Sequence, residues 1–493
     1  MESNEKSLLV RSPSRRVHWS VLLIVVAQLL SVSSTSFAAE ARRLQVSDNG
    51  RHLVYENGEP FFWLADTGWQ IFHRLTREEA DAYLEKRAAQ GFTVIQAMTL
   101  AEHKLFKIPN RYGYYPLINL DPLRPNEDYF EHVDYVIDKA QSLGLFMALV
   151  ATWGDKVRKA WGEGPEIFND RNAFGYGKWL GNRYKSNQVV WILGGDRDPV
   201  GYEPVWRAMA RGLKEGCQGR QLATYHGANR KNKGSSPFFH NDEWLDFNFT
   251  YSGHRWSYPT YEQIARDRAL EPVKPTLDGE PLYENHPALG DGTGFYSNRR
   301  LWDRITRGTS HQTRQSAYWA MLAGAAGHTY GCHDVWQFHN ELSEPITHSN
   351  VMWYEAVDFD GPRQMGLMRR LFESRPWQKL VPDQSTIIAS QRGGELHIQA
   401  ACASDGSFLF AYLPQGGTVT IDMTKLSGKR TRASWFDPRS GNTTAPGEFA
   451  RGKTRSFKTP RSGRIWDWVL VLDNAERQFP APGSARYSEY AER

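Results

Sequence analysis

The chain has 493 residues, 40% of them hydrophobic and 13% aromatic, which is enough for two or three globular domains with real cores. Its formal charge is only +5 at neutral pH, and its basic residues look scattered rather than blocked, which argues against a nucleic-acid-binding protein. The three cysteines, Cys217, Cys332 and Cys402, are far apart and odd in number, which argues against a disulfide framework and a zinc cluster. One disulfide bond among the three is possible, but the sequence does not say which two cysteines would form it.

The first forty residues have the features of an export signal. Arginines between positions 11 and 16 precede the apolar run 21–30, and the small residues Ser36 and Ala38 follow at the spacing that a signal peptidase recognises. We expect cleavage near Ala38 and a secreted or periplasmic protein without a membrane anchor. An uncleaved anchor is the alternative, but this run is shorter than the roughly 20 residues that a membrane span needs. No later segment is long and apolar enough to cross a bilayer.

From about residue 45 to 380, short apolar runs alternate with amphipathic segments. Strands are expected at Phe61–Ala65, Thr93–Met98, Phe146–Thr152, Val189–Leu193, Leu222–Tyr225, Phe247–Tyr251, Thr276–Leu277 and His328–Tyr330. Helices are expected at Thr76–Gln90, Tyr129–Ser142, Arg171–Tyr184, Glu203–Glu215, Tyr261–Leu270, His311–Ala325 and Pro362–Phe372, the first opened by a capping box of Thr76 and Glu79.

Eight strands joined by helices predict an α/β fold, a (β/α)8 TIM barrel, because parallel strands need crossover helices and eight of them close the sheet without edges. An open doubly wound sheet is the competing fold. It is less favoured because no G-x-G-x-x-G motif follows the first strand.

After about residue 382 the pattern changes to short alternating runs broken by Gly-Gly and Asp-Gly, as in "STIIASQRGGELHIQAACASDGSFLFAYL". Such runs are typical of antiparallel hairpins. We therefore predict a β-sandwich over residues 382–475. The tail, residues 476–493, is polar and contains proline, and we expect it to be loose.

The stretch "QVVWILGGDRDP" (188–199) places a carboxylate directly after an apolar strand. In a (β/α)8 barrel the carboxyl ends of the strands form one face, where the catalytic groups lie. Asp196 would lie there after the fourth strand, and the glycines Gly194 and Gly195 would let the backbone bend and a ligand approach. The alternative is that Asp196 only caps the following turn.

The seventh strand supplies a partner in "KPTLDGEPLYENHP" (274–287). Strands four and seven face each other across the barrel, so carboxyls on both can reach one glycosidic bond: one protonates the leaving oxygen, and the other attacks the anomeric carbon or activates water. Glu280, at the strand end, is the chosen partner of Asp196. Glu284 is the reserve, and it can equally be the first-turn acid of a helix.

Other polar and aromatic residues recur at the same end of nearly every expected strand. The candidates for substrate binding are Asp66, Trp69, Gln96, Trp153, Tyr225, His226, Tyr251, His254, Glu284, His333 and Trp336. Aromatic faces are what sugar rings stack on, so this distribution suits a sugar-binding cleft. The histidines lack metal-ligand spacing, so neither a metal nor a cofactor is predicted.

The segments "GEPFFWLADTGWQIFHRLTREEADAYLEKRAAQGFTVIQAM", "VVWILGGDRDP" and "PTLDGEPLYENHP" resemble the apiosidase-like barrels of glycoside hydrolase family 140. The later motifs "WFDPRSG" and "DWVLVL" are similar to the collagen-binding-type domain that often ends such chains. The resemblance implies a retaining enzyme with Asp196 as acid/base and Glu280 as nucleophile. It also implies a substrate in branched plant pectin, rhamnogalacturonan II, cleaved at an apiose linkage.

Two functions therefore stand at this stage. The first is an exported glycoside hydrolase that cleaves a pectic side chain and has an oligo- or polysaccharide as its partner. The second is a non-catalytic protein that grips a glycan or a matrix protein with the barrel rim and the C-terminal domain. Two opposed buried acids favour the enzyme, because binding alone does not need them. The sequence leaves open the sugar, internal or terminal attack, and the oligomeric state.

Overall fold

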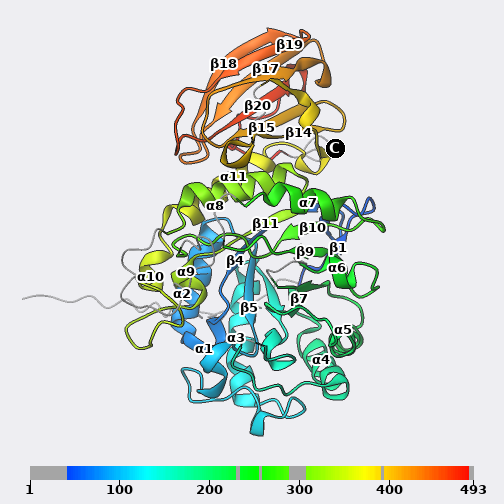
Figure 1. Cartoon of the computed structure of the whole chain (residues 1–493), viewed down its shortest axis with the longest axis vertical. Coiled ribbons are helices and arrows are strands. Elements are labelled where there is room, and N and C mark those ends of the chain that lie inside the picture. Colours follow the sequence, from blue (N-terminus) through cyan, green and yellow to red (C-terminus); the bar gives the residue numbers. More distant parts are fainter. Residues whose placement is uncertain are drawn as a thin grey trace, which may run out of the picture. The chain divides into compact units, whose positions relative to one another are not determined.

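The computed structural model of the protein describes residues 41–160, 162–228, 234–254, 258–287, 307–389 and 393–487. The expected signal segment lies outside these residues. In the described part of the chain, every helix is too short or too polar to span a bilayer. Figure 1 shows a sheet wrapped by helices and, after it, a two-layer domain built mainly of strands.

The first domain is the predicted barrel. Its eight strands are β4 (Trp63–Thr67), β5 (Val94–Met98), β6 (Phe146–Val150), β7 (Val189–Gly194), β8 (Ala223–His226), β9 (Asn248–Thr250), β10 (Thr276–Asp278) and β11 (Gly327–Tyr330). All neighbours are parallel, in the order β8-β7-β6-β5-β4-β11-β10-β9. Between the two ends of this order, the amide of Asp246 donates to the carbonyl of Ala223 (2.9 Å) and the Thr224 hydroxyl donates to the carbonyl of Phe247 (2.7 Å). All eight predicted strands are confirmed.

The long helices also follow the prediction to within a few residues. The helices of the first domain are α1 (Ile71–Arg74), α2 (Arg77–Ala89), α3 (Glu127–Ser142), α4 (Asp170–Tyr184), α5 (Glu203–Gly216), α6 (Ser236–Phe239), α7 (Thr260–Arg268), α8 (Ser310–Leu322), α9 (His333–Trp336), α10 (Trp353–Ala356) and α11 (Asp360–Glu373). The capping box of Thr76 and Glu79 is present at the start of α2, where it satisfies two amides of the first turn.

Alternate residues of the barrel strands enter two different cores. Trp63 and Ala65 of β4 pack inside the barrel with residues such as Val190, while Leu64 packs between the sheet and the helices. This alternation follows from the period of two along a strand, and it decides which strand residues can face the interior.

A small antiparallel sheet precedes the barrel and was not anticipated. It consists of β1 (Leu44–Val46), β2 (Leu53–Tyr55) and β3 (Pro60–Phe61). Phe61 belongs to this sheet rather than to the first barrel strand, and its ring packs edge-on against that of Phe146 (5.2 Å between centroids). These three strands therefore lie against the strand β6 of the barrel.

The second domain is the predicted sandwich of two antiparallel sheets. One sheet has the order β12-β14-β15-β20-β17-β18 and the other β13-β16-β19. The strands are β12 (Leu380–Pro382), β13 (Ile387–Ala389), β14 (Gln399–Ala403), β15 (Phe408–Leu413), β16 (Thr418–Asp422), β17 (Arg430–Phe436), β18 (Thr443–Ala450), β19 (Thr454–Lys458) and β20 (Trp468–Asn474).

The two domains are joined by buried ion pairs. Arg314 of α8 donates two hydrogen bonds to Asp467 (2.9 and 2.8 Å), and the Tyr412 hydroxyl donates to the same carboxylate (3.0 Å). Arg375 makes a second two-pronged pair with Asp473 (3.0 and 2.7 Å). Such pairs fix orientation, because a buried charge left without its partner is costly.

The expectation of a loose tail is wrong for residues 476–487. Phe479 is buried, and its ring packs edge-on against Phe408 (5.7 Å) and Tyr487 (5.1 Å). The apolar ring anchors this segment to the sandwich despite its polar composition, because burying it removes apolar surface from water. Residues 488–493 lie outside the described part. All three cysteines are buried and free, so none of them forms a bridge here.

Candidate active site

Asp196 lies two residues beyond the end of β7, in a backbone conformation that two glycines make accessible. Gly194 and Gly195 have φ of +88° and +125°. A Cβ at Gly195 would lie 2.5 Å from the indole of Trp153, so only glycine fits against that ring. Asp196 itself has φ of +51°, which is uncommon for a residue with a side chain. The "GGD" motif therefore turns the chain sharply at the strand end and sets the carboxyl of Asp196 there.

Glu280 follows β10 and is held by three side chains. His226 Nε2 lies 2.7 Å from its Oε2, the Tyr283 hydroxyl donates to its Oε1 (2.7 Å), and His254 Nε2 lies 3.5 Å from the same Oε1. Glu280 is buried, with 4% of its surface exposed. Burial alone would raise its pKa, but the hydrogen bonds and charges of His226 and His254 outweigh burial and hold the pKa of Glu280 below its ordinary value.

The carboxyl groups of Asp196 and Glu280 lie close to each other. One oxygen of Asp196, one oxygen of Glu280 and one ring nitrogen of His226 all lie within 4.8 Å of one another. Oδ1 of Asp196 is buried and has no hydrogen-bond partner among the described residues. Burial, and then the negative charge of Glu280, raise the pKa of Asp196 from 3.8 to about 8. At neutral pH one acid is therefore protonated and its neighbour ionised, the division of roles that acid–base catalysis needs.

His226 stabilises the ionised form of Glu280 through a hydrogen bond and its charge. Its Nε2 faces Glu280, and its Nδ1 lies 3.1 Å from the carbonyl oxygen of Gly227. Because both ring nitrogens face oxygen acceptors, the charged imidazolium is favoured. Burial opposes this charge, but the hydrogen bond and charge of Glu280, together with the charge of Asp196, raise the pKa of His226.

Several predicted binding residues gather around this pair. The ring of Trp69 lies 5.4 Å from that of Trp153, and both indoles approach His226 (6.0 and 5.4 Å). Tyr251 lies on another side of His226 (5.3 Å) and contacts His254 (6.1 Å). Trp69 also donates its indole N–H to the hydroxyl of Tyr283 (3.2 Å). These aromatic side chains pack around His226, the residue that contacts Glu280.

His333 and Trp336 lie one layer farther out. The ring of His254 stacks on His286 (4.1 Å), and His286 meets His333 edge-on (4.7 Å). Trp336 in turn lies 6.1 Å from His333 and directs its indole N–H toward Nδ1 of that ring (3.5 Å). His286 links these residues to His254 and Tyr283, which contact Glu280.

Three other predicted binding residues are bonded to groups other than the two carboxyls. Asp66 accepts hydrogen bonds from Tyr83 (2.6 Å) and Arg87 (2.5 Å) of α2, so it lies between the sheet and the helices. The side chain of Tyr225 packs in the same layer, and its hydroxyl donates to the carbonyl of Arg197 (2.9 Å). Gln96 is inside the barrel, where it donates to the Thr329 hydroxyl (2.9 Å). All three side chains are fully buried and each makes at least one hydrogen bond, so they fit structural roles.

Glu284 also has partners that differ from those of Glu280. Its Oε2 accepts hydrogen bonds from the Tyr330 hydroxyl (2.6 Å) and from the backbone N–H of Gly361 (3.1 Å). Gly361 lies in the first turn of α11, so the carboxylate stabilises a helix N-terminus. Burial raises the pKa of Glu284 to about 7. The geometry separates the two glutamates into one beside Asp196 and one beside α11.

Sequence reasoning missed four residues near the pair. Tyr283 and His286 stand three and six positions after Glu280, inside a segment already singled out. Glu102 and His103 follow β5, and their side chains lie 3.2 Å apart. Burial opposes charge on His103, but Glu102, Asp155 and Asp196 raise its pKa. The strand-end rule that selected Asp196 could have found Glu102, which lies four residues after β5 ends.

Two comparisons with known proteins identify the chain. Residues 47–379 match the family model of the apiosidase-like catalytic domain. The chain belongs to this family. Residues 381–473 of this apiosidase-like protein match the model described as the putative collagen-binding domain of a collagenase, so both parts of the resemblance are confirmed. A search of curated proteins gives no match.

Solved structures agree with this assignment. The apiosidase-like chain is 29% identical to a glycoside hydrolase family 5 protein from Bacteroides vulgatus, with a TM-score of 0.81 over 90% of this chain and 96% of that chain. A second structure, described as a glycoside hydrolase, gives 29% identity and a TM-score of 0.80 over 89% and 98%. The protein is therefore a glycoside hydrolase with a (β/α)8 catalytic domain, and carbohydrate is its substrate.

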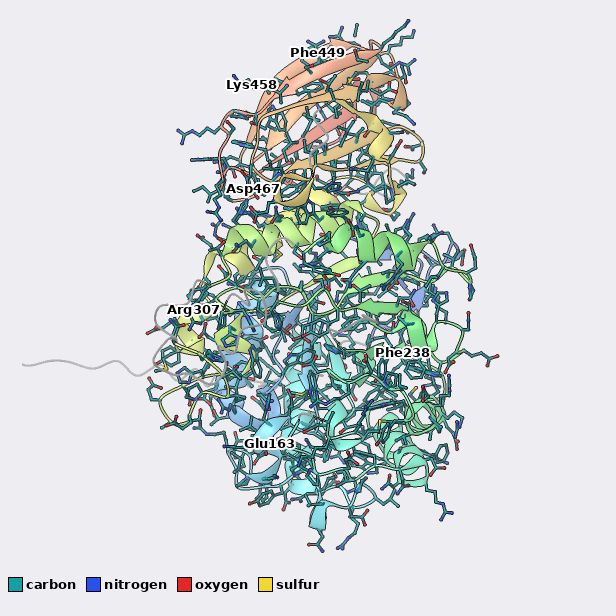
Figure 2. The ribbon with its side chains drawn as sticks, viewed as in Figure 1. Glu163, Phe238, Arg307, Phe449, Lys458 and Asp467 are labelled. Atoms are coloured by element: carbon teal, nitrogen blue, oxygen red, sulfur yellow. The ribbon has the colours of Figure 1, made fainter. Side chains whose placement is uncertain are left out.

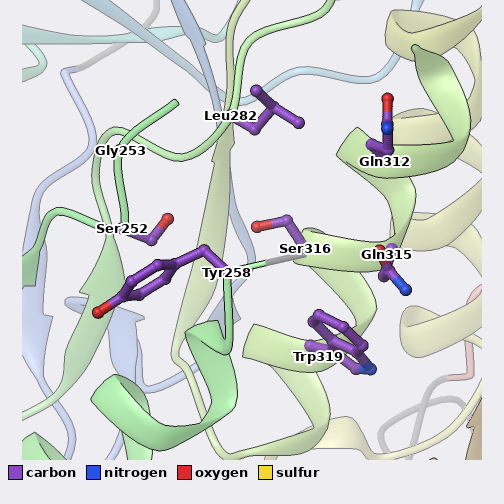
Figure 3. A pocket seen from close by; sticks show the side chains of 8 residues that line it. All are labelled: Ser252, Gly253, Tyr258, Leu282, Gln312, Gln315, Ser316 and Trp319. Carbon is purple, nitrogen blue, oxygen red and sulfur yellow. The ribbon is translucent and has the colours of Figure 1, made fainter. Parts of the chain in front are cut away.

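Two hollows of the apiosidase-like barrel stand out, and neither is lined by Asp196 or Glu280. One is a cavity of about 10 Å³ between α8 and the segments after β9 and β10; its lining includes Ser252, Leu282 and Ser316 (Figure 3). This volume suits about one water molecule and excludes a sugar. A second, of about 380 Å³, is bounded by Phe106, Tyr115 and Leu117 of the segment between β5 and α3.

The same three side chains that meet at the site can also hold a cation. Asp196, His226 and Glu280 offer two carboxylate oxygens and one imidazole nitrogen within 4.8 Å, a donor set that divalent transition metals accept. His226 already bonds Glu280 at 2.7 Å, so a bound metal would have to replace that contact. The arrangement is complete for proton transfer without this replacement.

Proposed function

We propose that the protein is a retaining glycoside hydrolase in which Asp196 is the general acid/base and Glu280 the nucleophile. The observation that carries the proposal is the pair itself: two carboxyl oxygens within 4.8 Å of each other, with pKa values pushed in opposite directions. A separation of about 5 Å between the carboxyl groups suits direct attack on the sugar, whereas inverting enzymes leave about 6.5–9.5 Å for a water molecule.

In the first step, a carboxylate oxygen of Glu280 attacks the anomeric carbon while the bond from that carbon to the leaving oxygen breaks. Asp196 gives its proton to the leaving oxygen, so the alcohol departs neutral and the sugar remains as an ester of Glu280. Tyr283 and His226 hold the nucleophile by its two oxygens. Their donors keep Glu280 ionised and orient it for attack.

In the second step, Asp196 is ionised and removes a proton from a water molecule. The water oxygen bonds to the anomeric carbon, the ester bond to Glu280 breaks, and both carboxyls return to their starting states. Two displacements at one carbon restore its configuration. The raised pKa of Asp196 serves both steps, because a group that titrates near neutral pH can both give and accept a proton.

The proposed substrate is a side chain of a plant pectic polysaccharide, cleaved at an apiose linkage. Two things support this choice: the match to the apiosidase-like family and the aromatic side chains of Trp69, Trp153 and Tyr251 around His226. We also infer export of the enzyme, because residues 1–38 carry the composition of a signal peptide.

The test is hydrolysis of a panel of pectic oligosaccharides, with the anomeric configuration of the first product followed by proton NMR. We expect release of apiose or an apiose-ended fragment with the configuration of the substrate. Asp196→Asn and Glu280→Gln should each lower the rate by about 10³-fold or more. An inverted product would contradict the nucleophilic role of Glu280, and no cleavage across the panel would contradict the substrate class.

A further inference from the structure

The sandwich carries an unbalanced positive charge that the barrel chemistry does not use. Between positions 425 and 464 the sequence has eleven Lys and Arg residues but only two acids, Asp437 and Glu448. The expectation of scattered basic residues is therefore wrong for the second domain. The buried acids Asp467 and Asp473 pair with Arg314 and Arg375 of the first domain, and of the eleven basic residues only Arg432 shares one of them, Asp473, within the described part of the chain.

Six of these basic residues stand together after β18. They are Arg451, Lys453, Arg455, Lys458, Arg461 and Arg464, and all six are exposed. Across the part of the chain that the structure describes, no carboxylate forms an ion pair with any of them. By contrast, Arg430, Arg432 and Arg439 of the same domain pair with Glu448, Asp473 and Asp437. We call these six residues the basic edge.

The topology places the basic edge along one side of the sandwich. β18 is the last strand of the six-stranded sheet and β19 the last strand of the three-stranded sheet. The chain passes from one to the other through residues 451–453, and the rings of Phe449 and Phe457 lie 6.3 Å apart. Figure 2 shows Phe449 and Lys458 on this part of the sandwich and Asp467 at the end beside the barrel.

Aromatic rings and hydroxyls accompany the charges. The guanidinium of Arg455 lies over the ring of Phe449 (3.4 Å), and that of Arg461 lies over Trp466 (4.7 Å). On the exposed face of the adjoining strands, the hydroxyls of Thr420 and Ser456 lie 2.8 Å apart. The rings hold the guanidinium groups in place, while hydroxyls that bond sugar hydroxyls and cations that pair with carboxylates are groups that bind an acidic polysaccharide.

We propose that the basic edge binds a carboxylate-bearing polysaccharide and holds the enzyme on its polymeric substrate. This inference rests on the proposed function, because the glycosidase barrel is what favours an acidic glycan over another polyanion. A row of unpaired cations attracts a repeating anion over several contacts at once, and the attraction weakens as salt screens it. The site is separate from Asp196 and Glu280, so binding and hydrolysis can be tested independently.

The experiment measures binding of the full chain to polygalacturonate. Glu280→Gln serves as the background, so that binding does not depend on turnover. A triple variant, Lys453→Gln, Lys458→Gln and Arg464→Gln, removes three charges of the basic edge. The matched control, Arg171→Gln, Arg211→Gln and Arg220→Gln, removes three exposed barrel charges that form no ion pair within the described residues.

We expect polygalacturonate to bind, and to bind less tightly as sodium chloride rises from about 50 mM to about 300 mM. The basic-edge triple should weaken binding by about tenfold or more, the control by less than about twofold. Both triples, made in the wild-type background, should keep the parent's activity on short oligosaccharides. Equal losses in the two triples would overturn the proposal. So would equal or tighter binding of neutral pectic galactan or of duplex DNA.

These outcomes separate the inference from the proposed function. If no pectic glycan is hydrolysed but polygalacturonate binds through the basic edge, the proposed activity fails and the binding surface stands. If hydrolysis proceeds normally and polygalacturonate does not bind at low salt, the basic edge has another role and this inference is wrong.

Discussion

Replacing Asp196 by Asn should stabilise the protein while it abolishes hydrolysis. The carboxyl of Asp196 has a pKa of about 8 in the folded chain against 3.8 as its ordinary value, so the folded state binds its proton more tightly than the unfolded state. A group with a raised folded pKa contributes full stability below the unfolded pKa, and this contribution is lost as pH rises toward the folded pKa. Asn stays neutral in both states and avoids that loss.

The magnitude follows from the two pKa values. Each pK unit corresponds to about 1.4 kcal/mol, which gives ceilings of about 2 kcal/mol at pH 5 and about 5 kcal/mol at pH 8. Asp196 is partly exposed, and solvent screening reduces such values. We therefore expect Asp196→Asn to gain about 1–3 kcal/mol over the parent at pH 8 and less than about 1 kcal/mol at pH 5.

Thermal unfolding of parent and variant at a series of pH values measures this difference. For a chain of this size a gain of 1 kcal/mol raises Tm by about 1 °C, so the expected rise at pH 8 is about 1–3 °C. The decisive feature is the trend: the gap between the two proteins should widen from pH 5 to pH 8. A variant that is less stable than the parent, or a gap that does not change with pH, would refute the raised pKa of Asp196.

Three further predictions concern the site and the domain junction. The kcat/KM of the parent should fall as pH rises through about 8, because Asp196 then loses the proton that it must donate; a profile that stays flat to pH 10 would contradict this assignment. Tyr283→Phe should lower kcat/KM by about 10- to 100-fold and move the acidic limb to higher pH, because Glu280 loses a donor to its charged form; an unmoved limb would show that Tyr283 does not act on the nucleophile. Arg314→Met should destabilise the chain by about 3–5 kcal/mol in denaturant unfolding, because it leaves Asp467 buried without its partner, and adding Asp467→Asn should recover part of that loss; a loss below about 1 kcal/mol would mean that the pair does not hold the junction.

The barrel strands could be predicted because each is a buried apolar run bounded by turn residues. Val189–Gly194, for example, is buried throughout, as strands covered on both faces are. The sheet β1–β3 could not be predicted, because its strands have only two or three residues each and give no usable period. In the tail, the single buried ring of Phe479 outweighs a polar composition that would otherwise favour disorder.

The sequence predicted which residues lie at the carboxyl ends of the strands, but not the direction in which each side chain points. Asp196 and Glu280 were chosen because they follow strands, and the structure brings them together. Asp66 and Tyr225 were chosen by the same rule, yet both point outward, since Leu64 and Asp66 share one face of β4 while Ala65 lies on the other. A shift of one residue along a strand reverses the face on which the side chain lies. Tyr225 therefore packs between the sheet and the helices, while its neighbour His226 contacts Glu280.

The account depends on a covalent link between a sugar and Glu280. Slowing the second step in the Asp196→Asn variant and feeding it a substrate with a good leaving group should let this species accumulate. Peptide mass spectrometry then locates the added sugar, with Glu284→Gln as the control for the neighbouring glutamate. We predict a glycosyl ester on Glu280 that persists in the Glu284→Gln background. An adduct on Glu284, or turnover with no covalent species and an inverted product, would contradict the mechanism.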